Sequence, residues 1–239
     1  MFDLANNNFN GHIPYQFGNL FRLNTLYLFL NQLQGSIPPT LGGCRSLRVI
    51  SMETNNLTGT IPSWLGNISS LEYINLGRNN LHGSIPSELG MLSQLRFIQL
   101  GVNNLTGQIP SPLANCTSLQ VLAIVNNHFT GNIPAEFCTK NTQLTALFMG
   151  ANQLSGSIPA SLLNCTILQN FDVASNQLSG VVFKEFGKLT QLKWLNLGSN
   201  DLVSSNTANL PILTSLTNCS NSQKLYFFVT ILRDVFPLP

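Results

Sequence analysis

Leucines recur along this chain at a fixed period, and this repeat constrains the fold more than any other feature. Successive units begin 24 residues apart, with one unit of 25, at Leu23, Leu47, Leu71, Leu95, Leu119, Leu144, Leu168 and Leu192. The unit at Leu95 reads L-x-x-I-x-L-x-x-N-x-L-x-G-x-I-P-x-x-L. A unit this short cannot bury its own apolar face, so neighbouring units must cover it. The pattern predicts a solenoid.

Each recurring position has a physical role. The L-x-x-L-x-L segment alternates, which predicts a six-residue strand with inward leucines, and stacked units then form a parallel sheet. The glycine suits a tight turn, and the proline fixes φ where no ladder hydrogen bond is needed. The ninth-position amide can satisfy backbone groups of the turn in its own repeat and the next. This structural asparagine ladder comprises Asn7, Asn31, Asn55, Asn79, Asn103, Asn127, Asn152, Asn176 and Asn200.

The composition agrees with a repeat that is solvated by neutral groups. Charged residues make up 8% of the chain, whereas 30 residues are asparagine. The longest apolar stretch, near Tyr226–Leu232, is interrupted by Thr230 and is shorter than the roughly 18 residues of a membrane-spanning helix. A hydrophobic content of 44% with a net charge of +2 excludes a disordered chain.

The regularity of the repeat fades toward the C-terminus. Val182 and Phe183 stand where other units have Ile-Pro, and Ser204 stands where glycine is expected. An insertion, a degenerate last repeat and an unmatched tail follow. We therefore divide the chain into a regular solenoid over residues 1–203, with about eight full repeats after a partial first one, and a degenerate segment over residues 204–239.

The sub-pattern L-x-G-x-I-P is more specific than the general repeat, because seven of the eight glycines concerned are followed by x-Ile-Pro. It resembles the plant-type leucine-rich repeat of receptor-like kinase and receptor-like protein ectodomains, and of polygalacturonase-inhibiting proteins. The resemblance implies an α/β-type solenoid, a right-handed curved superhelix with a concave parallel β-sheet and a second short sheet beside it. It also implies short helical or 3-10 turns on the convex side.

Several parts of that family are not found in this sequence. We find no secretory signal, no cysteine-paired cap, no transmembrane helix and no kinase motifs in the 239 residues. We therefore interpret the chain as a fragment of an ectodomain or a truncated gene product, and expect apolar residues at its ends. In the full-length family member, the resemblance implies a location on the extracellular side of the plasma membrane.

No residue pattern indicates catalysis. His12, His82 and His128 occupy variable turn positions in different repeats, with no carboxylate recurring in phase. Metal binding needs three or four convergent ligands, and acid–base catalysis needs a base within reach of the reacting group. We therefore expect no enzyme activity, metal or cofactor. The 11 basic residues form no stripe, so we expect no nucleic-acid partner either.

The five cysteines do not form an obvious disulfide pattern. Cys116 and Cys165 share a phase but lie two repeats apart, or about 10 Å at the usual strand spacing. Cys138 lies between them in a different phase, which leaves a pairing with one of them open. We interpret most of the cysteines as half-buried small hydrophobic residues.

Six Asn-x-Ser/Thr sequences could accept N-linked glycans, at Asn56, Asn67, Asn104, Asn115, Asn164 and Asn218. Chance alone predicts about five in a chain this rich in asparagine, serine and threonine. None falls within a predicted strand, so glycans would leave the sheet face bare.

The third and fifth positions of each unit should point outward and form a rigid recognition surface. Aromatic residues at such positions are typical interface anchors, and neutral amides beside them suit hydrogen bonding to a peptide backbone or a glycan. The predicted ligand-binding residues are Tyr27, Val49, Ser51, Tyr73, Asn75, Phe97, Gln99, Phe148, Asp172 and Trp194.

Three functions remain open on this basis. The first is an extracellular recognition module of a receptor-like kinase ectodomain, which binds a peptide, protein or glycan, with a co-receptor ectodomain as a further partner. The second is a secreted inhibitor of a cell-wall hydrolase. The third is a truncated gene product without function.

Overall fold

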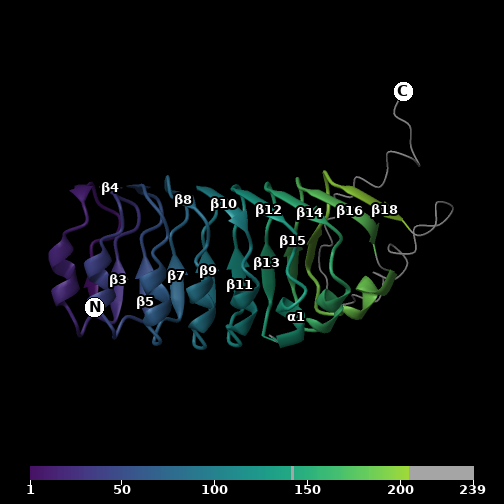
Figure 1. Ribbon diagram of the computed structural model, residues 1–239, viewed down its shortest axis with the longest axis horizontal. Coiled ribbons are helices and arrows are strands. Elements are labelled where there is room, and N and C mark those ends of the chain that lie inside the picture. Colours follow the sequence, from purple (N-terminus) through teal and green to yellow (C-terminus); the bar gives the residue numbers. More distant parts are fainter. Residues whose placement is uncertain (141–142, 183, 205–239) are drawn as a thin grey trace, which may run out of the picture.

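The inward leucines build one parallel sheet that runs the length of the solenoid in the computed structural model, which describes residues 1–140, 143–182 and 184–204 (Figure 1). The expected six-residue strands are shorter, because regular pairing covers only the third to fifth positions of each unit. The strand order is that of the sequence: β1 (Phe2–Asp3), β3 (Thr25–Tyr27), β5 (Val49–Ser51), β7 (Tyr73–Asn75), β9 (Phe97–Gln99), β11 (Val121–Ala123), β13 (Ala146–Phe148), β15 (Asn170–Asp172) and β17 (Trp194–Asn196). We call this the concave sheet.

Two shorter parallel sheets form a second layer beside the concave sheet, as the family resemblance implied. The first contains β2 (Asn10–His12), β4 (Gln32–Gly35) and β6 (Asn56–Leu57). The second contains β8 (His82–Gly83), β10 (Asn104–Gln108), β12 (His128–Gly131), β14 (Gln153–Gly156), β16 (Gln177–Val182) and β18 (Asp201–Ser204). An isolated bridge between Thr60 and His82 links the two sheets.

The side of the solenoid opposite the concave sheet carries one short helix per repeat. Seven are 3-10 helices: η1 (Tyr15–Asn19), η2 (Pro39–Gly43), η3 (Ser63–Asn67), η4 (Ser87–Met91), η5 (Ser111–Asn115), η6 (Ala160–Asn164) and η7 (Lys184–Lys188). The proline of the Ile-Pro pair is the N-cap residue of η1 to η6, and it accepts the first helical hydrogen bond, as from Leu65 to Pro62. The 25-residue unit instead forms the α-helix α1 (Phe137–Lys140).

The leucine and isoleucine columns form one continuous core. Buried side chains run without interruption from Ile13 to Leu202. Val182 is 3% exposed and takes the place of the isoleucine missing from its repeat. Each repeat therefore contacts mainly its neighbours, as expected of a stacked array.

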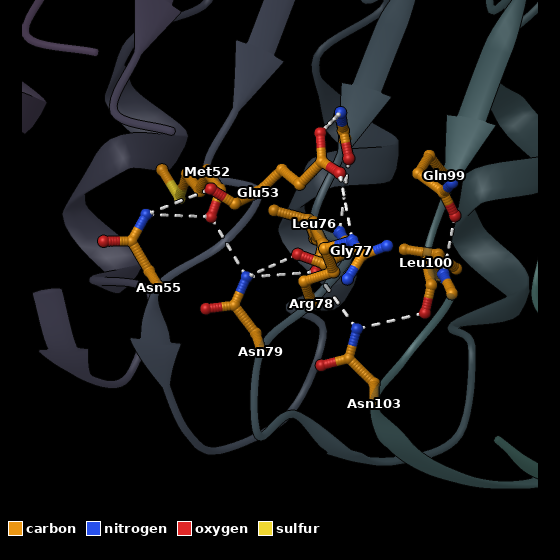
Figure 2. A network of polar contacts seen from close by, with 12 residues as sticks. Met52, Glu53, Asn55, Leu76, Gly77, Arg78, Asn79, Gln99, Leu100 and Asn103 are labelled. Atoms are coloured by element: carbon orange, nitrogen blue, oxygen red, sulfur yellow. Dashed lines mark hydrogen bonds and ion pairs between the residues drawn. The ribbon is translucent and has the colours of Figure 1, made fainter. Parts of the chain in front are cut away.

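The ladder asparagines form hydrogen bonds within and between repeats, and they differ from the expectation in one respect. The Asn103 amide Nδ2 donates to the carbonyl oxygens of Leu100 in its own repeat at 3.0 Å and of Leu76 in the preceding repeat at 3.1 Å. Its Oδ1 accepts from the Leu81 amide at 3.0 Å. Figure 2 shows the corresponding bonds of the Asn79 amide, to Leu76 in its own repeat and to Met52 in the preceding one. The side chain therefore links its own repeat to the preceding one, whereas the sequence interpretation had the next one.

The residue before each ladder asparagine has a left-handed backbone. These residues have φ between +52° and +60° and are Asn6, Leu30, Thr54, Arg78, Val102, Asn126, Ala151, Ser175 and Ser199. The repeated glycines also have positive φ, as the turn interpretation requires, for example +81° at Gly107. A left-handed conformation costs a non-glycine residue roughly 1–2 kcal/mol, and β-branched residues tolerate it least.

Replacing Val102 by asparagine should therefore raise the free energy of unfolding by about 1 kcal/mol, because asparagine tolerates the left-handed region. Asn6 and Asn126 already occupy the equivalent position in other repeats. Val102 is 38% exposed, so little packing is lost. Denaturant melts measure the gain. Val102→Thr is the matched control, since threonine is also β-branched; an equal gain from threonine would exclude relief of strain as the cause.

Close packing of η3 against η4, and of η4 against η5, requires glycine at a position that the sequence pattern did not single out. A Cβ placed on Gly90 in η4 would lie too close to the backbone carbonyl of Pro112 in η5, and one on Gly66 would collide with Glu88. Ala114 occupies the same position in η5, where the following helix is α1 rather than a 3-10 helix. Leu163 occupies this position in η6, which is followed by the 3-10 helix η7, so a larger residue here does not by itself change the next helix.

A disulfide links the 25-residue unit to the next unit. Cys138 in α1 is bonded to Cys165, the C-cap of η6, with a Cα–Cα distance of 5.2 Å. The pairing that the sequence left open is therefore made, because α1 brings Cys138 beside the next repeat. Both cysteines are buried, so our interpretation of most of the cysteines as half-buried residues is wrong for these two. Cys219 lies outside the described residues.

Candidate ligand-binding face

All ten predicted ligand-binding residues lie on the concave sheet. Neighbouring strands pair in register, so equivalent residues form rows across the sheet; Val49 pairs with Tyr73, and Tyr73 pairs with Phe97. The five aromatic residues among them are half-buried rather than fully exposed. Ser51 and Asn75 are only 4% and 6% exposed, so they form the floor of the face and offer little contact area.

Two aromatic pairs stiffen the first half of this face. The Tyr73 and Phe97 rings are stacked, with a centroid separation of 4.3 Å and an interplanar angle of 3°. Tyr27 and Phe29 meet edge to face at 5.8 Å. Such pairs contribute about 0.5–1.5 kcal/mol beyond the burial of their area, and they hold the rings in place before any ligand arrives.

Between these pairs the sheet surface is hollowed. The hollow has a volume of about 550 Å³ and is lined by Asp3, Tyr27, Phe29, Val49, Ser51, Glu53, Tyr73 and Asn75. We call it the β3–β7 hollow. Asp3, Phe29 and Glu53 were not among the predicted residues. The inward–outward alternation continues to the seventh position of the unit, and this signal would have identified Phe29 and Glu53.

Polar contacts fix the Glu53 carboxylate at the edge of the hollow. Its Oε2 accepts from the Asn75 amide at 2.8 Å, and its Oε1 lies 3.8 Å from the Arg78 Nε (Figure 2). Burial raises the pKa of the Tyr73 phenol, the nearby Glu53 carboxylate raises it further, and a hydrogen bond with Asn75 opposes both effects. Tyr73 is therefore a neutral group at physiological pH.

The remaining candidate groups do not converge on a reactive site. His12, His82 and His128 lie apart on the second-layer strands β2, β8 and β12. Among the described residues, no group of three or more histidine, cysteine, aspartate or glutamate side chains could hold a metal ion. Burial raises the pKa of the Cys116 thiol to about 11 and also raises that of Cys44. Thiols with such pKa values stay protonated and react slowly.

The possible glycan acceptors lie away from the concave sheet, but one expectation about them was wrong. Asn56 and Asn104 begin β6 and β10 of the second layer, so they do fall within strands. Asn67, Asn115 and Asn164 are the last residues of η3, η5 and η6. All five side chains are exposed. Asn218 lies outside the described residues. Glycans at the five described positions would leave the concave sheet open.

Two leucine-rich-repeat families match the sequence. One covers residues 45–105, and the other covers residues 1–20, 22–44 and 118–139. Together with the stacked parallel strands and the asparagine ladder, these matches show that the chain belongs to the leucine-rich-repeat family. A search of the curated proteins finds no match.

Within this family, the chain is similar to solved ectodomains of plant receptors. A TDR receptor superposes with a TM-score of 0.87 at 30% identity, over 95% of this chain and 38% of the receptor chain. The plant peptide hormone receptor RGFR1 in complex with RGF2 gives 0.77 at 33% identity, over 93% and 38%. The Arabidopsis receptor kinase HAESA, with the peptide hormone IDA and the co-receptor SERK1, gives 0.53 at 26%, over 94% and 50%.

This chain therefore spans half or less of the length of these receptor chains. They are structures of receptors, two of them in complex with peptides. Among the described residues of this chain, no helix is long and apolar enough to cross a membrane.

Proposed function

We propose that this chain is a ligand-binding part of a receptor-kinase ectodomain on the extracellular side of the plasma membrane, and that it binds an extended peptide along the concave sheet. The observation that carries the proposal is the series of half-buried aromatic side chains on strands held in register by inward leucines. Aromatic anchors on a rigid support bind at low cost in conformational entropy.

The polar groups between the anchors support a peptide ligand. Gln99 and Asp172 are half-buried on the same sheet; the Gln99 amide can donate hydrogen bonds to a peptide backbone and accept from it, and the Asp172 carboxylate can accept from backbone N–H groups. Two of the similar receptors were solved with peptides, and one of these also with a co-receptor ectodomain. A second ectodomain that contacts both the peptide and the solenoid is therefore part of the proposal.

The test is capture of peptides from a phage-displayed library of short random sequences by the folded chain. The variant Phe97→Ser, Phe148→Ser, Trp194→Ser should weaken binding of the captured peptides by about 30-fold or more, the loss expected when anchor residues are removed. The control variant Ser63→Ala, Ser87→Ala, Ser111→Ala changes exposed residues that begin η3, η4 and η5. It should leave binding intact.

Thermal melts of both variants establish that they are folded. Loss of binding in the Ser63, Ser87 and Ser111 variant alone would place recognition on the helical side of the solenoid, opposite the concave sheet. Failure of the folded chain to capture any peptide would remove support for the proposal and favour the truncated gene product.

A further inference from the structure

One face of the Tyr73 ring is open toward the β3–β7 hollow. Tyr73 and Phe97 stack at 4.3 Å with nearly parallel planes, and this separation is close to the roughly 4.8 Å between neighbouring strands. The stacking direction therefore runs across the strands. Phe97 covers the Tyr73 face that points toward β9, so the opposite face points toward β5 and the hollow, where the side chain directly across from Tyr73 is Val49, which is shorter than the ring.

The next aromatic residue across the hollow is Tyr27 on β3. Tyr27 pairs with Ser51, and Ser51 pairs with Asn75 on β7, so two strand steps separate β3 from β7. At the usual spacing this is about 10 Å. Tyr27 thus lies in the fifth-position row, whereas Tyr73 lies in the third-position row with Val49, so the two rings border the hollow without facing each other directly. A flat group stacked on Tyr73 needs about 3.5 Å from the ring plane, and the hollow of about 550 Å³ has room for it.

The charge of the hollow is negative. It contains two carboxylates, Asp3 from β1 and Glu53 from the seventh position after β5. The only cation that ion-pairs with Glu53 among the described residues is Arg78, whose Nε lies 3.8 Å away and whose side chain is 65% exposed. Such an exposed pair is weak and screened by salt. Arg48 forms an ion pair with Glu72 instead, with a distance of 2.8 Å between the Arg48 Nε and the Glu72 Oε1.

From these observations we propose that the β3–β7 hollow binds an arginine side chain of a peptide ligand, with its guanidinium stacked on Tyr73 and paired with Glu53. This inference rests on the proposed function and specifies the chemistry of its ligand. Guanidinium is planar, always charged and well suited to stack on aromatic rings while it pairs with a carboxylate. Lysine lacks the flat surface that stacks on the Tyr73 ring.

The test uses the peptides captured from the random library, each resynthesised with arginine, lysine or citrulline at its basic position. Citrulline has the shape of arginine without the charge. We expect captured peptides to be enriched in arginine, and citrulline to weaken binding by about tenfold or more, the range of a partly desolvated cation–π contact with an ion pair. Lysine should fall between the two.

Glu53→Gln links this effect to the hollow. It should weaken binding of the arginine peptide by about tenfold and leave the citrulline peptide nearly unchanged. Glutamine keeps an oxygen that can accept from Asn75, so folding should be preserved, and a melt verifies it. Glu88→Gln is the matched control, because it makes the same change at an exposed carboxylate of η4, away from the concave sheet; it should leave binding of both peptides unchanged.

The outcomes separate this inference from the function on which it rests. Peptides that lose binding in the Phe97, Phe148 and Trp194 variant, but lack arginine or ignore Glu53→Gln, would overturn the arginine site and leave the peptide-binding face standing. Equal binding of the lysine and arginine peptides would overturn the stacked guanidinium. If no peptide is captured, both proposals fail together.

Discussion

Replacing Cys138 and Cys165 together by alanine is expected to lower the free energy of unfolding by about 3–4 kcal/mol. The bond closes a loop with a sequence separation of 27 residues, and releasing it restores conformational entropy to the unfolded chain. It also unlinks α1 from η6 at the 25-residue unit, where the regular 3-10 packing is interrupted. No other repeat within the described residues has a covalent link of this kind.

Denaturant melts with and without a thiol reductant measure this effect. The midpoint of the unmodified chain should fall in the reductant, whereas that of the double variant should not respond. Cys44→Ala is the control for loss of a buried sulfur, because the Cys44 thiol donates to the Phe17 carbonyl and forms no disulfide. An unmodified chain whose midpoint ignores the reductant would contradict a stabilising role for the bond.

The repeat could be predicted from the sequence because each inward position recurs in every unit. Leu71, Leu95 and their equivalents are fully buried, as their alternation indicated. The left-handed residues could not be predicted in the same way. Thr54, Arg78 and Val102 share this conformation without sharing any chemistry, because the hydrogen bonds of the next residue, the ladder asparagine, impose it. The strain is a property of the turn and not of the residue that bears it.

The recognition surface was predicted only in part, for a related reason. The periodicity of the sequence predicts which way a side chain points. It does not predict the exposed fraction of that side chain, which depends on its neighbours. Asn75 points outward, yet its hydrogen bond with Glu53 and the adjacent side chains leave it 6% exposed. The hollow exists because the small Ser51 stands beside Tyr27, and Val49 beside Tyr73, on the strand between the two tyrosines. Side chains of different size at these positions of three successive repeats form a hollow only when the strands are placed side by side in register.

Removing a ladder asparagine is expected to have the second large effect on the free energy of unfolding. Asn103→Ala should destabilise the chain by about 2–3 kcal/mol, because the Leu81 amide and the Leu76 and Leu100 carbonyl oxygens lose a buried partner. These groups lie between two repeats, where water does not readily replace the missing amide. In a stacked array, stability depends on interfaces between neighbours, so damage at one ladder position weakens the junction on which the repeats at both sides depend.

Asn104→Ala is the matched comparison, one residue further along the chain. Its side chain is exposed at the start of β10, so its loss should cost less than about 0.5 kcal/mol. Denaturant melts of the two variants, made without glycosylation, decide the matter. The same residue type is removed in both cases, and only the direction of the side chain differs. Equal losses would mean that the amide of Asn103 does not join the repeats, and that the leucine columns alone hold adjacent units together.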